Sequence, residues 1–337
     1  MLLRKNDHGL NDHVSVVKAI AMLLLLYGHT GVPALSHTFS MLRMPVFLMA
    51  SGYCFKDYYL EHRGEFAWRR VKSLYWPFVK WSLIFVLLHN ALWHLGFYHS
   101  GTVLYNWRGM AEQLPHIAVM HVTDEMLGGY WFITELFFST IIFVVLSPLI
   151  SRCPLLWCAV LVGVAMLMET MGWHFRVRSA TFLSAAFYTL GFWVRGRELS
   201  HNGWVIAALA AAVWGVSLVL PGHLNHIDPV TLPVFFVVVA LGGWLMSALA
   251  WQVLTHCPKL TRVLCHIGNR TLIILTLHLT AMRALSWVLT HCGVLPAGHI
   301  AEFPPVYLFP LYMLVGLAGP LLYDALAENV KMVFRKH

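Results

Sequence analysis

The chain is 337 residues long, 59% of its residues are hydrophobic and only 11% are charged. A soluble domain carries about 25% charged residues, so this composition excludes an ordinary soluble protein of this size. The formal net charge of +8 is explained below by the distribution of Lys and Arg along the chain, and it is not a nucleic-acid-binding signature.

Apolar runs of about twenty residues recur along the chain, and each matches the roughly 30 Å hydrocarbon core when built as a helix. The alternation of polar and apolar positions that a membrane β-barrel requires is not seen. We predict an all-α integral membrane protein with about ten transmembrane helices and a single domain over residues 1–337. The predicted spans are 14–33, 38–56, 73–96, 130–150, 154–172, 180–195, 203–220, 230–251, 267–291 and 306–325.

Most Lys and Arg residues lie at the span ends that are predicted to share one side of the membrane. Arg108, Arg176 and Arg178 lie at the opposite ends, and Lys18, Arg43, Lys80 and Arg283 lie inside spans. The larger set contains Arg4, Lys5, Lys56, Arg63, Arg69, Arg70, Lys72, Arg152, Arg195, Arg197, Lys259, Arg262, Arg270, Lys331, Arg335 and Lys336. Because basic residues favour the cytoplasmic side, both termini are predicted to be cytoplasmic. We expect a multi-pass protein of a bacterial inner membrane.

The first span carries two titratable groups, Lys18 and His29. Ionisable groups in hydrocarbon are costly, so each is a candidate functional residue. Eleven residues of helix bring the two side chains to within about 20° of each other, about 16 Å apart along the axis. In the alternative interpretation, Lys18 reaches the inner headgroups and His29 bonds a backbone carbonyl.

The second and fourth spans carry further candidates. Pro45 weakens the second helix near Arg43 and Ser51, and broken membrane helices are tolerated where the backbone lines a cavity. Arg43 is therefore a candidate for binding a polar or anionic substrate group; alternatively it faces the outer headgroups. In the fourth span, Glu135 is expected at a depth comparable to that of His29, where a carboxylate fixes the tautomer of an imidazole and raises its basicity. The alternative is that Glu135 pairs with Arg43 for packing alone.

His278 lies in the middle of the ninth span. It either lines a polar site or is a core histidine bonded to a carbonyl, and the second interpretation is favoured. The outer connection 97–129 is expected to form a short amphipathic segment over the outer mouth. The sequence contains no pattern of zinc ligands, so no metal site is predicted.

Five stretches together resemble the acyltransferase 3 family of integral-membrane acyltransferases, including its fucose 4-O-acetylase-like branch. Each motif is weak alone, but the ordered set covers nearly the whole chain. The stretches are Val17 to Ala21 leading to Tyr27-Gly28-His29, Met44 to Phe47 with Ser51-Gly52-Tyr53, Arg69-Arg70 before Pro77-Phe78, Trp131 to Leu136, and Ile267-Gly268-Asn269 through His278. Many members have Arg where this chain has Lys18, a change that keeps the charge but loses the bidentate fork.

The resemblance implies an O-acyltransferase, and specifically an O-acetyltransferase, with His29 as the catalytic residue and acyl-CoA, here acetyl-CoA, as donor. Glu135 would orient His29, and Arg69, Arg70 and Lys72 would bind the phosphates of the donor. Those three cations equally suit attraction to anionic lipids. A carbohydrate or glycan hydroxyl would be the acceptor, with Lys18, Arg43, Ser51, Trp131 and His278 as substrate-binding residues.

Two other functions fit the same residues. A proton-coupled exporter or flippase of a small polar solute also needs titratable groups and broken helices at mid-depth, although it is expected to show internal repeats, which are not detected. A non-catalytic membrane scaffold would retain its function without His29. The sequence predicts no nucleic-acid partner and leaves the oligomeric state open.

Overall fold

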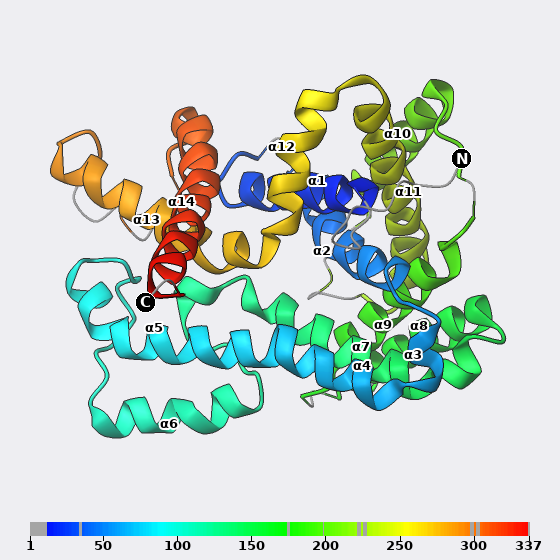
Figure 1. The fold of residues 1–337 in the computed structure, drawn as a ribbon, viewed down its shortest axis with the longest axis horizontal. Coiled ribbons are helices and arrows are strands. Elements are labelled where there is room, and N and C mark those ends of the chain that lie inside the picture. The colour runs from blue at the N-terminus through cyan, green and yellow to red at the C-terminus, as the bar shows by residue number, and fades with distance from the viewer. Residues whose placement is uncertain are drawn as a thin grey trace. The chain divides into compact units, whose positions relative to one another are not determined.

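The computed structural model describes residues 12–33, 36–173, 176–197, 199–220, 224, 228–296, 300 and 304–335. Of the basic residues used to orient the chain, Arg4, Lys5 and Lys336 lie outside these ranges. All regular secondary structure in the described residues is helical (Figure 1). The all-α prediction is therefore confirmed for this part of the chain.

Each of the ten predicted spans contains a helix. These helices are α1 (Asp12–Gly28), α2 (Ser36–Tyr53), α5 (Trp76–His94), α7 (Tyr130–Ile150), α8 (Pro154–Thr170), α9 (Ser179–Val194), α10 (Gly203–Ser217), α11 (Leu232–His256), α13 (Thr271–His291) and α14 (Phe309–Arg335). Shorter helical segments connect them: α3 (Tyr58–Glu61), α4 (Arg63–Arg70), the π-helical η1 (Val71–Tyr75), α6 (Trp107–Ala118), η2 (Glu125–Leu127), α12 (Pro258–Asn269) and η3 (Val306–Leu308).

Five helical segments of the described chain are long and apolar enough to cross a membrane. They are Arg63–His94, Tyr130–Ile150, Leu232–His256, Thr271–His291 and Val306–Val330. Three shorter helices, α8, α9 and α10, are also apolar. The protein is thus a multi-pass membrane protein, whereas a full set of ten crossings and the side of each terminus stay predictions.

Several boundaries of the predicted spans do not coincide with helix ends, and two of these differences have a local cause. The first span was expected to remain helical to residue 33, but α1 ends at Gly28 because Gly31 adopts a positive φ of 72° and Pro33 cannot continue a helix. The span 267–291 begins within one helix and continues in another, because α12 ends at Asn269 and α13 starts at Thr271.

The described chain divides into two compact units, each assembled from separate segments. The first comprises residues 1–25, 34–72 and 135–269 and the second comprises 26–33, 73–134 and 270–337, in each case only as far as the described ranges given above extend. The chain passes from one unit to the other five times, and three of these passages lie inside helical segments, in α1, η1 and α7.

Close contact between α2 and α9 organises the first unit. A Cβ added to Gly52 would lie 1.9 Å from the Tyr188 carbonyl oxygen, and one added to Gly191 would lie 2.0 Å from the Met49 carbonyl oxygen. Glycine at both positions lets the two backbones touch, as at other helix interfaces in membranes. Aromatic side chains, among them Phe55, Phe143 and Tyr188, form a buried cluster beside this contact.

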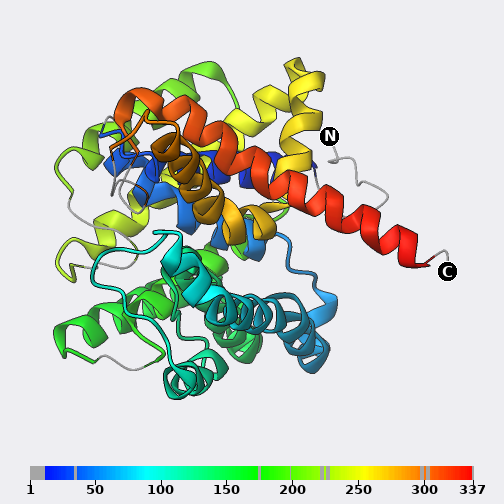
Figure 2. The same cartoon turned by 90° about the vertical axis from the view of Figure 1, so that its left-hand side faces the viewer.

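In the second unit, α6 lies alongside α5 (Figures 1 and 2). Asn90 exchanges two 2.8 Å hydrogen bonds with the Tyr105 backbone at one end, and the Tyr75 hydroxyl donates to the Ala118 carbonyl (3.0 Å) at the other. These contacts make α6 antiparallel to α5. A short amphipathic segment was predicted in the outer connection, and the structure shows a helix there that returns along α5.

The helices α13 and α14 also pack against each other in the second unit, and α14 continues past α13 toward the C-terminus (Figure 2). Arg270 Nε donates to Asp324 Oδ2 at 2.8 Å, and Ser286 and Tyr312 share a 2.7 Å hydrogen bond between hydroxyls. These contacts fix the position of α13, which carries His278, against α14.

Candidate active site

His29 lies in the turn that closes α1 rather than inside the helix. Its backbone N–H donates to the Leu26 carbonyl (3.0 Å), and the Thr30 hydroxyl caps the Tyr27 carbonyl (2.7 Å). Thr30 is fully buried, whereas His29 is half-buried. The turn therefore fixes the backbone of His29 and leaves part of its surface accessible, which suits a reactive imidazole better than a sealed core position.

His278 is the side chain that the structure places beside His29. The centroids of the two imidazole rings are 5.0 Å apart, and the ring planes are inclined by 52°. His278 is completely buried, and its Nδ1 lies 3.1 Å from the Ile274 carbonyl oxygen and 3.0 Å from that of Leu275. The favoured interpretation, a core histidine bonded to carbonyls, is confirmed for this nitrogen.

The start of α7 approaches the same part of α13. A Cβ added to Gly129 would meet Leu275 Cδ1 at 2.7 Å and His278 Cε1 at 3.7 Å, so glycine is required there for close approach. The Tyr130 hydroxyl shares a 2.8 Å hydrogen bond with Thr276 Oγ1. Trp131 follows and is half-buried in the same unit. The predicted site residues His29, Trp131 and His278 thus belong to one unit.

Glu135 is buried as predicted, with 1% of its side chain exposed. Its two carboxylate oxygens accept hydrogen bonds from Arg178 Nε (2.9 Å) and from the Thr181 hydroxyl (2.6 Å). The sequence interpretation proposed an imidazole or Arg43 as partner, and the structure instead shows a different guanidinium and a hydroxyl. An orienting role toward His29 would link residues of different units and stays a prediction.

The predicted substrate-binding residues Lys18, Arg43 and Ser51 lie in α1 and α2, within the first unit, and all three are half-buried. Neither Lys18 nor Arg43 makes a hydrogen bond or ion pair with any described residue. A half-buried cation with no hydrogen-bonded or ion-paired partner among the described residues is electrostatically suited to an anionic or strongly polar ligand.

The three predicted donor-binding cations have different surroundings. Arg69 is exposed and pairs with Glu65 (3.3 Å), and Lys72 lies over the Trp68 ring. Arg70 turns inward, with its guanidinium carbon 4.7 Å from the centroid of the Phe66 ring.

Arg70 and Tyr188 are near neighbours, yet Arg70 Nε and the Tyr188 hydroxyl are buried without a partner in hydrogen-bond geometry among the described residues. Lys18 and Arg70 also lie close enough to the Cys54 thiol to act on it electrostatically. Sequence reasoning missed Tyr188, because an apolar helix containing a tyrosine gives no sign that its hydroxyl faces a cation.

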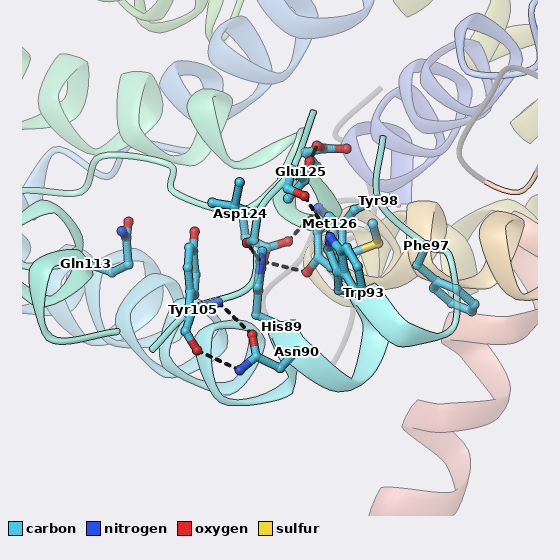
Figure 3. Close-up of polar contacts among 12 residues, drawn as sticks. His89, Asn90, Trp93, Phe97, Tyr98, Tyr105, Gln113, Asp124, Glu125 and Met126 are labelled. Atoms are coloured by element: carbon cyan, nitrogen blue, oxygen red, sulfur yellow. Dashed lines mark hydrogen bonds and ion pairs between the residues drawn. The ribbon is translucent and has the colours of Figure 1, made fainter. Parts of the chain in front are cut away.

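A second polar cluster, also missed from the sequence, ties down the connection between α5 and α7 (Figure 3). Asp124 Oδ2 accepts from the Tyr98 hydroxyl (2.7 Å) and lies 3.3 Å from His89 Nδ1, while His89 Nε2 lies 3.1 Å from the Val103 carbonyl oxygen. Burial and the neighbouring Asp124 carboxylate raise the pKa of Tyr98 far above its usual value. The polar groups of this cluster bond to one another, and these bonds hold the connection between α5 and α7 in place.

Glu125 also binds the connection between α5 and α7, and it links this connection to α13. It accepts from the Thr102 hydroxyl (2.6 Å) and lies 2.7 Å from His99 Nδ1 and 3.3 Å from Arg283. Burial acts to raise the pKa of Glu125, but the hydrogen bonds from Thr102 and His99 and the Arg283 charge outweigh it, so the pKa lies below its usual value.

Comparison with known proteins identifies the framework on which these residues lie. Residues 11–324 match the family model described as an acyltransferase domain, that of acyltransferase 3. The chain belongs to the acyltransferase 3 family. The match covers all of the predicted site residues, and the acyltransferase is therefore a membrane protein of a transferase family. No curated protein and no solved structure gives a significant match.

Membership in the family gives several sequence motifs of the acyltransferase a structural reason. The Ile267-Gly268-Asn269 stretch packs on α1, because a Cβ on Gly268 would lie 1.9 Å from the Ser15 carbonyl oxygen and Asn269 accepts from the Ser15 hydroxyl (2.9 Å). Gly52 of the Ser51-Gly52-Tyr53 stretch forms the α2–α9 contact. Within the described residues of the acyltransferase, no group of His, Cys, Asp and Glu side chains has a metal-binding arrangement.

Proposed function

We propose that the acyltransferase moves an acetyl group from acetyl-CoA to a hydroxyl of a carbohydrate or glycan, with His29 at the reaction centre. The observation that carries the proposal is the half-buried His29 ring beside the buried His278 ring, in a membrane chain of an acyltransferase family. An accessible imidazole held by a fixed turn is suited to proton transfer from a hydroxyl.

In this mechanism His29 accepts the proton of the acceptor hydroxyl while that oxygen attacks the thioester carbonyl carbon. The carbon–sulfur bond then breaks, the ester forms, and the proton returns from His29 to the departing CoA thiolate. A transient acyl group on His29, formed by attack of the imidazole itself, is the alternative order of the same transfer.

The donor is proposed to bind through its phosphates to Arg69, Arg70 and Lys72. Support comes from Arg70, which is half-buried and whose Nε has no partner in hydrogen-bond geometry among the described residues. A phosphate oxygen would satisfy this group, and charge-assisted hydrogen bonds from Arg to phosphate are among the strong ones. Lys18, close to the same Cys54 thiol as Arg70, would bind a further polar group of the donor.

The acceptor is proposed to use Arg43, Ser51 and Trp131, with the indole offering an apolar face to a sugar ring. A succinyl donor would use Arg43 to bind its additional carboxylate. We further propose that the acyltransferase resides in a bacterial inner membrane with cytoplasmic termini, so that acetyl-CoA reaches it from the cytoplasm.

The test is transfer of labelled acetyl groups by the purified protein in lipid nanodiscs. Wild type is expected to transfer label from acetyl-CoA to a glycan acceptor, whereas His29→Ala loses at least about 10²-fold in rate, the usual contribution of a general base. His291→Ala, which changes an exposed histidine at the end of α13, is the matched control and should retain full activity. Absence of acetyl-CoA turnover in wild type, or full activity in His29→Ala, would contradict the proposal.

A further inference from the structure

The short helix α12 joins two segments of the chain that are each long and apolar enough to cross a membrane, α11 and α13 (Figure 1). A segment that crosses occupies the full thickness of the hydrocarbon, so the residues that connect two such segments lie at a bilayer surface. The α12 helix starts at Pro258 and ends at Asn269, so it is a separate element at this surface and not a continuation of either neighbour.

One face of α12 is held against the beginning of α1. A Cβ added to Gly268 would lie 1.9 Å from the Ser15 carbonyl oxygen, and the Cys265 thiol donates to Asp12 Oδ1 at 3.6 Å. Leu264 is buried on the same side of the helix. This packing fixes the rotation of α12 about its own axis, and it therefore decides which side chains face away from the protein.

The opposite face of α12 carries two exposed cations. From Lys259 to Gly268 the helix turns by about 900°, which places Lys259 directly opposite the contact with α1. Lys259 and Arg262 lie about 60° apart around the axis, both are exposed, and neither makes a hydrogen bond or an ion pair with any described residue. The sequence contains no Asp or Glu from 229 to 301, so no nearby carboxylate along the chain neutralises these charges.

Exposed apolar side chains lie beside these cations. Leu260 is 45% exposed and Val263 is 56% exposed, and both lie within about 100° of Lys259 around the helix. A helix at a bilayer surface that combines cations with accessible apolar residues binds anionic lipid through both, because the phosphates attract the cations and the acyl region covers the apolar residues. A soluble anion would pair with the cations but would leave Leu260 and Val263 in contact with water.

We propose that the exposed face of α12 is a binding site for anionic phospholipid. Lys259 and Arg262 bind the headgroup phosphate, and Leu260 and Val263 lie among the upper parts of the acyl chains. Because the other face of α12 holds the beginning of α1, the bound lipid fixes both of these helix ends at the bilayer surface. This binding does not depend on the acyl donor or acceptor proposed above.

A photoreactive benzophenone side chain in place of Leu260 tests the site in the full-length protein. The protein is reconstituted in vesicles of equal parts phosphatidylglycerol, which is anionic, and phosphatidylcholine, which has no net charge. After illumination, mass spectrometry identifies the crosslinked lipids. Each basic residue near a membrane surface contributes about fivefold in affinity for anionic lipid, so we expect the crosslinks to favour phosphatidylglycerol by at least about fivefold.

Two variants show whether the cations cause this preference. Lys259→Gln combined with Arg262→Gln should reduce it to less than about twofold. Arg152→Gln, which removes an exposed cation just before α8, is the matched control and should leave it unchanged. Equal crosslinking to the two lipids without either change, or an unaltered preference in the double variant, would overturn the inference.

A measurement on the protein with both cations in place keeps the inference testable if the double variant does not accumulate. Raising the salt concentration screens exposed charges, so the preference for phosphatidylglycerol should fall as salt is added. A preference that does not respond to salt would overturn the inference. Crosslinks to a second copy of the chain in place of lipid, or displacement of the lipid crosslink by added CoA, would also overturn it, because the face would then bind a different partner.

Discussion

At the scale of single residues, Glu135 shows how a correct location can accompany an incorrect partner. Its place in an apolar helix indicated a buried carboxylate, and 1% of its side chain is exposed. Its partner, Arg178, is 43 residues away in sequence and was assigned to an outer helix end. The packing of α9 on its neighbours brings that guanidinium to Glu135, and no local pattern specifies this.

The pairing predicts a non-additive response to substitution at Glu135 and Arg178. Glu135→Ala leaves the Arg178 guanidinium and the Thr181 hydroxyl without their acceptor, and we expect a loss of about 2–3 kcal/mol, less than for a fully buried pair because Arg178 is 35% exposed. Arg178→Ala should cost a similar amount, and the double substitution less than the sum. Thermal unfolding in detergent of all four proteins measures this coupling, and strict additivity would contradict it.

Glu125 gives a prediction in pH. Because its pKa in the folded protein lies below the usual value, the ionised form is favoured by folding, and its contribution to stability is present above the unfolded-state pKa. That contribution is lost as the pH falls below about 4, through the folded-state pKa. The difference in melting temperature between wild type and Glu125→Gln should shrink as the pH falls below about 4. A difference that grows on acidification would show the sign to be wrong.

At the scale of elements, the hydropathy pattern predicted where the helices lie along the chain, but it did not predict which helices pack against one another. The tenth span was predicted to end at 325, yet α14 continues to Arg335, because polar residues beyond the apolar run still favour a helix. The outer connection was expected to contain a short amphipathic segment, and the structure shows the helix α6 there, held along α5 by contacts from Asn90 and Tyr75. These contacts join elements that only the tertiary packing brings together.

The glycine contacts between α2 and α9 predict which helix substitutions are tolerated. Gly52→Ala or Gly191→Ala would place a methyl group about 2 Å from a backbone oxygen and force the helices apart, at a cost of about 1–3 kcal/mol. Gly163→Ala in α8 is the matched control, since nothing lies within 4 Å of its added Cβ, and it should stabilise the helix by up to about 1 kcal/mol. Melting temperatures rank the three variants, and an unchanged Gly52→Ala protein would contradict the close contact.

At the scale of the whole molecule, one family domain covers residues 11–324 while the described chain forms two compact units. The units are discontinuous, so neither corresponds to one contiguous stretch of sequence. The sequence, which lacks linkers, indicated a single domain, and the family match is continuous across both units.

The distribution of Lys and Arg predicts the topology of the molecule. A reporter that is active only in the cytoplasm should function when fused after His337, and a reporter that is active only outside should function when inserted near Gly101 in the outer connection. The physical reason is the preference of basic residues for the cytoplasmic face. The opposite pattern at either position would show that the number of crossings is odd or that one predicted span does not cross.

The sequence by itself determined the all-helical membrane class, the approximate position of every long helix and the family resemblance, because hydropathy and ordered motifs are local properties of the chain. It also selected His29, Glu135 and His278 as polar groups in apolar surroundings. Only the tertiary structure decided that the His278 ring lies beside His29, that Arg178 and Thr181 bind Glu135, and that α6 packs on α5. Such contacts join residues far apart in sequence, and they depend on how helices pack against one another, which no single segment of the chain encodes.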